Sequence, residues 1–149
     1  TMKDLAQNVK VSHSLSAIVK TASANGTGID TKGFQSVTCV ADVGAAGITL
    51  NGTNKFSVGL EESDAPASGF SAVGNASVTG GTVDGSGHFQ VVDAPGHANQ
   101  AYKLGYIGGK RYVRGIVTHA GTHSTGTIVG LSIVLGDPIS APTANQAND

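Results

Sequence analysis

Apolar and polar residues alternate along most of this chain, and a period of two is the pattern of a half-buried β-strand. The first long segment places five apolar residues on one predicted face, namely Val9, Val11, Leu15, Ala17 and Val19. Residues 37–43 and 56–60 repeat the alternation. We therefore expect strands whose apolar faces, including that of residues 9–19, are turned toward a hydrophobic core.

Asn-Gly dipeptides interrupt the strand pattern at Asn25-Gly26 and Asn51-Gly52, and they suit the positive φ angles of tight turns. The chain contains about eight or nine short strand segments and no convincing helix. Many short antiparallel strands bury their apolar faces in a two-sheet sandwich or a barrel. We predict an all-β fold, with residues 1–138 as a single domain with an N-terminal arm and residues 139–149 as a flexible tail.

One hairpin is predicted in the second half of the chain. Ala101–Ile107 and Arg111–His119 are both strand-like, and Gly108-Gly109 lies between them. Pairing of these two strands through the glycine turn would place Tyr106 and Tyr112 near one another across the ladder.

The segment Thr127–Leu135 differs from the other predicted strands because it is apolar on both faces. One sandwich core covers only one face of a strand, so Ile128 and Val134 would remain on the uncovered side. Soluble proteins avoid such exposed apolar surfaces. We therefore expect a homo-oligomer, a dimer or a trimer with cyclic symmetry, and we include Ile128 and Val134 among the candidate partner contacts.

Composition narrows the function classes. The chain has 149 residues, of which 22 are glycine and 13% are charged, and it has no Trp. This low charge argues against disorder and against a coiled coil. The net charge of −1 predicts no general attraction to nucleic acid or to a membrane surface.

Cys39 is the only cysteine and lies in an apolar run, which is typical of a core thiol. No apolar run is long enough for a transmembrane helix or a signal peptide, so we expect synthesis without secretion.

Basic residues gather in one region, because no acidic residue occurs between Asp93 and Asp137. The cluster comprises Lys103, Lys110, Arg111 and Arg114. It is either a solvated strand edge or a contact patch for an acidic partner surface. Arg111 and Arg114 are three residues apart and should lie on opposite faces of a strand. We expect one arginine to pair within the protomer or at a subunit contact, and the other to reach solvent or a partner.

The residues that carry chemistry do not form a recognisable catalytic motif. His119 and His123 are four residues apart, but Gly121 between them favours a turn over a zinc-binding helix. We therefore expect two ordinary histidines beside a turn. The alternative is a metal site, because a hairpin could still bring the two imidazoles together. Glu61 and Glu62 are adjacent in a strand and so cannot face each other as an acid/base pair. The sequence predicts no enzyme, no metal and no cofactor.

Several segments, in order, resemble those of a family of phage proteins. The most distinctive is Ala101–Arg114, with the sequence AYKLGYIGGKRYVR. The other matching pieces are Asn25–Thr27, Asp30–Phe34, Phe56–Asp64, Val134–Pro138 and Ala141-Pro142. Together they resemble small proteins of tailed bacteriophages encoded beside the major capsid protein, among them the head decoration (cement) proteins. The resemblance does not extend to residues 74–96, where no strand order is predicted.

This resemblance implies an antiparallel β-sandwich with jelly-roll-like topology. It implies a non-enzymatic structural virion protein on the capsid exterior, made in the host bacterial cytoplasm, that stabilises the shell by binding the major capsid protein lattice. The alternative is a carbohydrate- or receptor-binding β-sandwich of a phage tail or spike. Three clustered tyrosines, Tyr102, Tyr106 and Tyr112, favour that alternative, and the lack of Trp weakens it.

Overall fold

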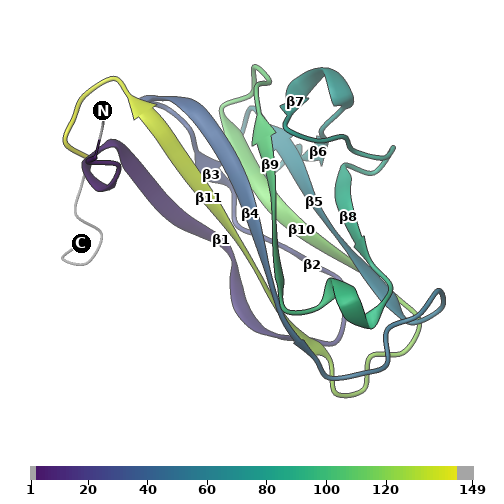
Figure 1. Ribbon diagram of the computed structural model, residues 1–149. Coiled ribbons are helices and arrows are strands. Elements are labelled where there is room, and N and C mark those ends of the chain that lie inside the picture. The colour runs from purple at the N-terminus through teal and green to yellow at the C-terminus, as the bar shows by residue number, and fades with distance from the viewer. Residues whose placement is uncertain (1–2, 144–149) are drawn as a thin grey trace.

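Two antiparallel β-sheets pack face to face in the computed structural model, which describes residues 3–143 (Figure 1). This confirms the predicted all-β sandwich. The strands are β1 (Val9–Lys20), β2 (Ala24–Asn25), β3 (Ile29–Asp30), β4 (Phe34–Ala46), β5 (Lys55–Ser63), β6 (Ser71–Ala72), β7 (Val78–Thr79), β8 (His88–Val92), β9 (Gln100–Tyr106), β10 (Tyr112–Ala120) and β11 (Thr127–Pro138). Three short 3-10 turns are η1 (Ala6–Asn8), η2 (Asn75–Ser77) and η3 (Pro95–His97). No helix of the described chain is long and apolar enough to cross a membrane.

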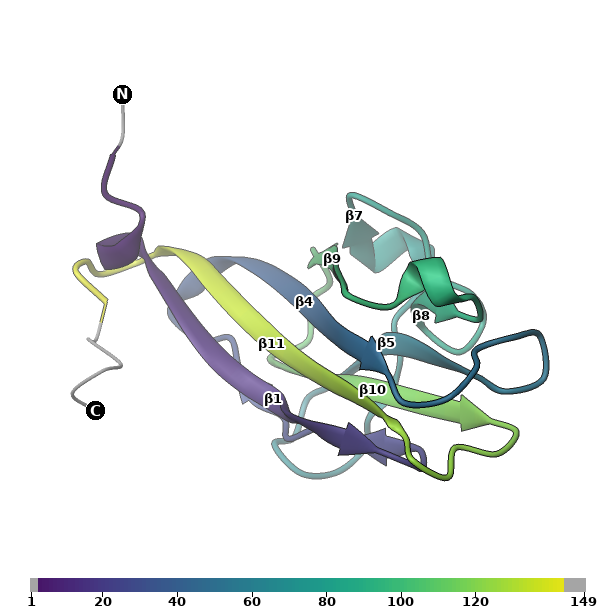
Figure 2. The ribbon, with the colours of Figure 1, turned by 60° about the horizontal axis from the view of Figure 1, so that its bottom comes forward.

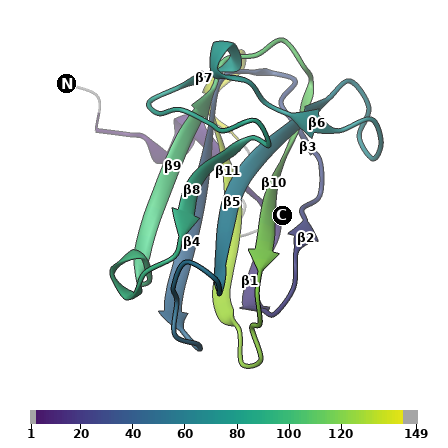
Figure 3. The ribbon, with the colours of Figure 1, turned by 90° about the vertical axis from the view of Figure 1, so that its right-hand side faces the viewer.

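The two sheets use strands that are distant in sequence. The first, here called sheet A, has the order β1-β11-β4-β9-β7. The second, sheet B, has the order β2-β10-β5-β6, with β3 added on β10 and β8 on β5. Figure 3 shows the two sets of strands from the side. The jelly-roll-like connectivity stays a prediction.

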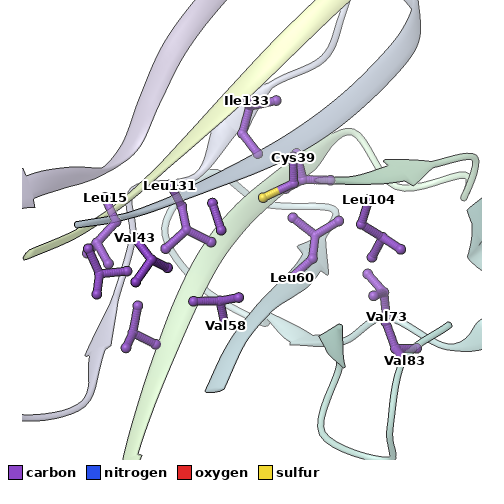
Figure 4. Packing of buried hydrophobic residues seen from close by; sticks show 14 of the residues in the cluster. Leu15, Cys39, Val43, Val58, Leu60, Val73, Val83, Leu104, Leu131 and Ile133 are labelled. Carbon is purple, nitrogen blue, oxygen red and sulfur yellow. The ribbon is translucent and has the colours of Figure 1, made fainter. Parts of the chain in front are cut away.

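The core lies between the inner faces of the two sheets. Cys39, Leu131 and Ile133 of sheet A meet Val58 and Leu60 of sheet B, and all five are fully buried (Figure 4). Burying one such aliphatic side chain stabilises the fold by roughly 1.5–3 kcal/mol. The alternating positions of β4, β5 and β11 therefore supply the core as the sequence pattern predicts.

Strand β1 turns its apolar face outward, which contradicts the prediction for residues 9–19. Of the five apolar residues assigned to a buried face, only Leu15 is buried, and Val19 is 52% exposed. Val9, Val11 and Val19 lie opposite Gly136, Val134 and Ile128, which are outward positions of β11. The register shifts on both sides of Leu15 turn Leu15 toward the core, and because each bulge reverses the alternation, the second shift restores the faces of the first half of the strand. The periodicity therefore places these valines on one face, as observed, but does not show that this face is turned outward.

The inward side of β1 carries two buried polar residues, and both are hydrogen-bonded. The Ser14 hydroxyl donates to the Thr27 carbonyl at 2.8 Å and accepts from the Gly115 amide of β10 at 2.8 Å. The Lys20 ammonium donates to the Ser16 carbonyl at 2.6 Å and to the Val129 carbonyl at 3.3 Å. Buried polar groups are tolerated when they are paired in this way. These contacts close the side of the sandwich between β1 and β10, here called the β1–β10 seam.

The predicted hairpin at Gly108-Gly109 is wrong. Strand β9 pairs with β4 and β7 in sheet A, whereas β10 pairs with β2, β3 and β5 in sheet B. The glycine segment is therefore a crossover between sheets. Tyr106 lies opposite Val37, and Tyr112 lies opposite Ser63, so the two tyrosines are not cross-strand neighbours.

The last described residues, 139–143, lie at the end of the sandwich where η1 precedes β1 (Figure 2). The Ile139 amide donates to the Gly33 carbonyl at 2.8 Å, and the Thr143 amide donates to the Gln7 carbonyl at 2.8 Å. Within the segment predicted as a flexible tail, residues 139–143 thus contact the domain, and residues 144–149 lie outside the described residues. The turn at Asn51 forms as predicted, because its side-chain oxygen accepts from the amides of Thr53 and Asn54.

Candidate contact surface

The outward side of sheet A carries an apolar strip, formed where β1 and β11 lie side by side (Figure 1). Val19 and Ile128 are directly opposite each other across this pair, and they are 52% and 44% exposed. Val134 lies further along β11 on the same side and is half-buried. Ile128 and Val134 therefore occupy the outward face of β11, as the sequence predicts.

Few charged residues interrupt this outward side. Val40 of β4 lies opposite Ser132 of β11 and Lys103 of β9. Residues 38–43 of β4 pair with β11 on one side and with β9 on the other. Among the outward residues of these paired segments, the charged ones are Asp42 and Lys103. We call the surface formed by Val19, Val40, Ile128, Ser132 and Val134 the apolar face of sheet A. It is suited to contact with another flat, weakly charged surface.

Glycine keeps this face flat beside Ile128. A Cβ atom on Gly44 would lie 3.1 Å from the Cβ of Ile128, tighter than ordinary van der Waals contact. The neighbouring position on β4 thus leaves room for the isoleucine to lie across the sheet. The result is a low surface on which a partner's side chains can pack closely.

The basic cluster is largely neutralised within the protomer. Lys110 pairs with Asp64 at 2.6 Å. Arg111 makes a two-pronged contact with Asp30, in which its Nε and Nη2 donate at 2.9 and 2.7 Å. The hydrogen bond from Arg111 is the largest cause that lowers the pKa of Asp30 to about 2. Both side chains of that pair are nearly half exposed, so solvent screens the interaction.

The sequence predicts that one arginine pairs within the protomer or at a subunit contact and the other reaches solvent or a partner, and Arg111, although paired with Asp30, is 47% exposed to solvent. Arg114 is the more enclosed of the two: its Nε donates to Glu61 at 2.8 Å and its Nη2 contacts the same carboxylate at 2.6 Å. Its guanidinium carbon lies 4.3 Å from the centroid of the Phe70 ring. Lys103 is the one member of the cluster without an ion pair among residues 3–143, and it lies at the edge of the apolar face of sheet A.

The tyrosines do not form an exposed aromatic platform. The Tyr102 hydroxyl donates to the His97 carbonyl at 2.7 Å, and the Tyr106 hydroxyl donates to Glu62 at 2.5 Å. Tyr106 is buried, and this burial, with the Glu62 hydrogen bond, raises the pKa of its hydroxyl. Tyr112 packs against the Arg111 guanidinium, 5.2 Å from its ring centroid. Two of the three hydroxyls are thus engaged inside the domain.

The titratable residues singled out in the sequence, His119, His123 and Cys39, lie in or beside the hydrophobic core. The loop after β10 does bring His119 and His123 together, with ring centroids 4.5 Å apart. Within the described residues, no group of three or more His, Cys, Asp or Glu side chains is placed to hold a metal ion. Cys39 is fully buried, and desolvation raises the pKa of its thiol to about 12. A thiol of this kind stays protonated and unreactive at neutral pH.

An open cavity of about 480 Å³ lies near the chain ends. Lys10, Lys32, Phe34 and Ile139 are among its lining residues, and the lining residues within 3–143 include neither a histidine nor a carboxylate.

No family model, no curated protein and no solved structure matches this chain.

The sequence pattern did not identify two members of the apolar face of sheet A, Val19 and Val40. Alternation places Val19 on the same face as Val11, which the structure confirms, but it gives no sign that this face is turned outward. Val40 lies between the buried residues Cys39 and Ala41, and strict alternation places it outward. The signal for Val40 is therefore present in the sequence, whereas the outward direction of Val19 is not.

Proposed function

We propose that this chain is a non-enzymatic structural protein of a tailed-phage virion. In this proposal it decorates the exterior of the capsid as a homo-oligomer and stabilises the shell by binding the major capsid protein lattice. It would be made in the cytoplasm of the host bacterium and would need neither cofactor nor nucleic acid. The resemblance of several segments, in the same order along the chain, to head decoration proteins supports the proposal, as does the two-sheet β-sandwich, for which a jelly-roll-like topology is part of the proposal.

The observation that carries the proposal is the apolar face of sheet A. Strand β1 turns Val19 outward while it buries Ser14 and Lys20 on its inward side. The inward polar residues are hydrogen-bonded, but leaving valine and isoleucine side chains in water on the outward side is unfavourable for an isolated protomer. Another protein surface that covers the outward side would remove this cost. We expect exposed apolar residues of this kind in a protein whose role is to bind another protein over a large contact area.

Contact with the shell is proposed to depend on shape and apolar burial more than on charge. Lys110, Arg111 and Arg114 are already paired with carboxylates of the same protomer. Lys103 remains as the basic residue available to an acidic partner. A modest interface is sufficient for such a role, because many copies on one lattice act together through avidity.

The alternative of a carbohydrate- or receptor-binding module receives less support. Adhesin grooves present aromatic rings to the ligand. Tyr106 is buried in this protein, and the Tyr102 hydroxyl is bound to a backbone carbonyl.

The test uses heads of the phage that encodes this chain, prepared from particles in which its gene is deleted. We expect the purified protein to bind these heads saturably, in a fixed ratio to the capsid subunits, and to raise the temperature at which they release DNA. Ile128→Lys should weaken this binding at least tenfold. Ile107→Lys is the matched control, since Ile107 is also exposed but lies on the crossover between the sheets. Binding only to tail structures or to a glycan would overturn the proposal.

A further inference from the structure

A buried histidine, His123, and a half-buried one, His119, pack together at the loop end of the core, on the side of the β1–β10 seam. The His119 ring of β10 stacks on Phe56 with centroids 5.4 Å apart and meets the edge of His123 at 4.5 Å. The Nε2 atom of His123 lies 3.0 Å from the Lys55 carbonyl and 2.9 Å from the Ala120 carbonyl. Carbonyl oxygens only accept hydrogen bonds, so this nitrogen carries the proton and donates it.

His119 lacks comparable partners. Both of its ring nitrogens are buried, and neither has a hydrogen-bond partner in good geometry; the polar group that approaches the ring is the backbone of Lys20 in β1. The Nδ1 atom of His123 and the Thr127 hydroxyl are also buried without a hydrogen bond. Buried polar atoms are normally paired, so an unpaired group of this kind requires a functional or structural reason.

The charged group that faces His119 from a neighbouring element has the same sign as a protonated imidazole. It is the Lys20 ammonium of β1. Strand β5 contributes the Phe56 ring and, to His123, the backbone carbonyl of Lys55. Ion pairs of histidine within the described residues are those of His88 with Asp84 and His97 with Asp93. Neither His119 nor His123 thus has a carboxylate that would balance an added proton.

The same region joins the two sheets. The His119 amide donates to the Ser23 hydroxyl, just after β1, at 2.8 Å. Lys20 reaches the Val129 carbonyl of β11 and therefore links β1 to the centre of sheet A. The first contact ties β10 directly to the end of β1, and the second holds the Lys20 ammonium, which acts on the His119 ring. Displacement of the ring would therefore loosen the attachment of β10 to the end of β1.

We propose that His119 is a proton-operated latch, which keeps the β1–β10 seam closed while its ring is neutral and opens the seam when the ring is protonated. A protonated ring would be a buried charge beside an ammonium group. Opening the seam lets the imidazolium reach water and moves it away from Lys20. The latch is a property of the protomer and does not depend on the proposed role in the capsid.

The direction of the pH effect follows from linkage. Desolvation is the largest cause that lowers the pKa of His119 to about 4, with further lowering by His123 and by the Lys20 ammonium, and a hydrogen bond with the Lys20 backbone opposes this shift in part. An imidazole in water has a pKa near 6.5, so the open state binds the proton more tightly. The seam is therefore fully stable above about pH 6.5 and loses stability as the pH falls toward 4. At pH 5 this favours the open state by a factor on the order of ten, after allowance for partial exposure of the ring.

The experiment is backbone hydrogen exchange of the full chain at pH 7.5 and pH 5.0, corrected for the intrinsic pH dependence of exchange. In the wild type, we expect peptides that cover residues 15–25 and 115–127 to open on the order of tenfold more at pH 5.0. Peptides from β4 should change little, which separates local opening from global unfolding. His119→Phe keeps an aromatic ring on Phe56 but cannot be protonated, so its seam should open equally at both pH values.

Two further variants complete the test. His119→Leu should also abolish the pH response, which guards against a specific effect of the phenylalanine ring. His13→Gln is the matched control, because His13 is an exposed histidine of β1 outside the cluster, and it should retain the wild-type response. A wild-type seam that opens no more at pH 5.0 than that of His119→Phe would overturn the proposal, as would loss of the response in His13→Gln.

Discussion

The hydroxyl of Tyr106 donates a hydrogen bond of 2.5 Å to Oε2 of Glu62, and so links the end of β9 in sheet A to β5 in sheet B. The same hydroxyl accepts a hydrogen bond of 3.0 Å from the amide of Lys110. A Cβ atom on Gly108 would lie 2.5 Å from that oxygen. The crossover between the two sheets is therefore folded around one phenolic group, and Gly108 is required for its close approach.

Removing this hydroxyl should destabilise the domain without changing its shape. Tyr106→Phe leaves Glu62 and the Lys110 amide without their partner, so we expect a loss of about 1–2 kcal/mol in the free energy of unfolding. Urea denaturation monitored by circular dichroism measures it. Tyr112→Phe is the control and should change stability by less than about 0.5 kcal/mol. Equal stability of both variants would show that the Tyr106 hydroxyl has no role in joining the sheets.

The two arginine pairs should respond differently to substitution. Arg114 and Glu61 are each about one-fifth exposed, and Arg114 also stacks on Phe70, so Arg114→Ala should cost about 1–2 kcal/mol. Arg111→Ala should cost less, because its pair with Asp30 is screened by water. Denaturation in low salt and in high salt measures this difference, and high salt should reduce only the Arg111 effect.

Acid titration distinguishes the Arg111 pair further. The pKa of Asp30 is lowered from its ordinary value to about 2, so the pair stabilises the fold above about pH 4 and this contribution is lost as the pH falls toward 2. The wild type and Arg111→Ala should therefore converge in stability in that range. A difference between them that is constant from pH 7 to pH 2 would contradict the assigned ion pair.

The sequence was sufficient for features that depend on local pattern. Alternation predicted the inward positions of β4, β5 and β11, and Asn51 predicted its turn. These signals are local because a strand's side chains alternate and a turn needs only its own residues. The apolar outward positions Ile128 and Val134 were found for the same reason.

Features that depend on distant partners were not predictable in this way. Nothing near Gly108-Gly109 shows that β9 continues sheet A while β10 begins in sheet B, because a crossover and a hairpin both use glycine. The pairing of Arg114 with Glu61 joins residues 53 positions apart. The outward direction of the valine face of β1, and the inward turn of Leu15 between two register shifts, are set by its pairing with β11. Each of these depends on tertiary context, which one sequence read locally does not contain.

Gly115 offers a direct test of packing between the sheets. It lies on β10 opposite the core residue Leu131, and a Cβ atom there would be 2.6 Å from the Cβ of Leu131. Gly115→Ala should therefore force the sheets apart locally and cost about 1–3 kcal/mol. Gly109→Ala is the control, since no atom lies within 4 Å of its added Cβ. Thermal unfolding compares the two, and an unchanged midpoint for Gly115→Ala would contradict the close sheet contact at Leu131.

The last prediction concerns self-association through the apolar face of sheet A. Val19 and Ile128 are opposite one another on β1 and β11, and both are about half exposed in the protomer. A symmetric oligomer buries at least two copies of each of these side chains, one from each protomer. Full burial of one such side chain contributes roughly 1.5–3 kcal/mol. Sedimentation equilibrium should therefore report a dimer or trimer for the wild type.

Ile128→Lys and Val19→Lys should shift the equilibrium toward monomer, because each would bury an unpaired ammonium group at the contact. Their thermal stability as monomers should stay close to that of the wild-type protomer, since the substituted positions face outward. Ile107→Lys changes an equally exposed residue off this face and should leave the oligomer intact. A wild type that is monomeric at all concentrations would refute self-association, and an oligomer that persists in both lysine variants would place its interface elsewhere on the molecule.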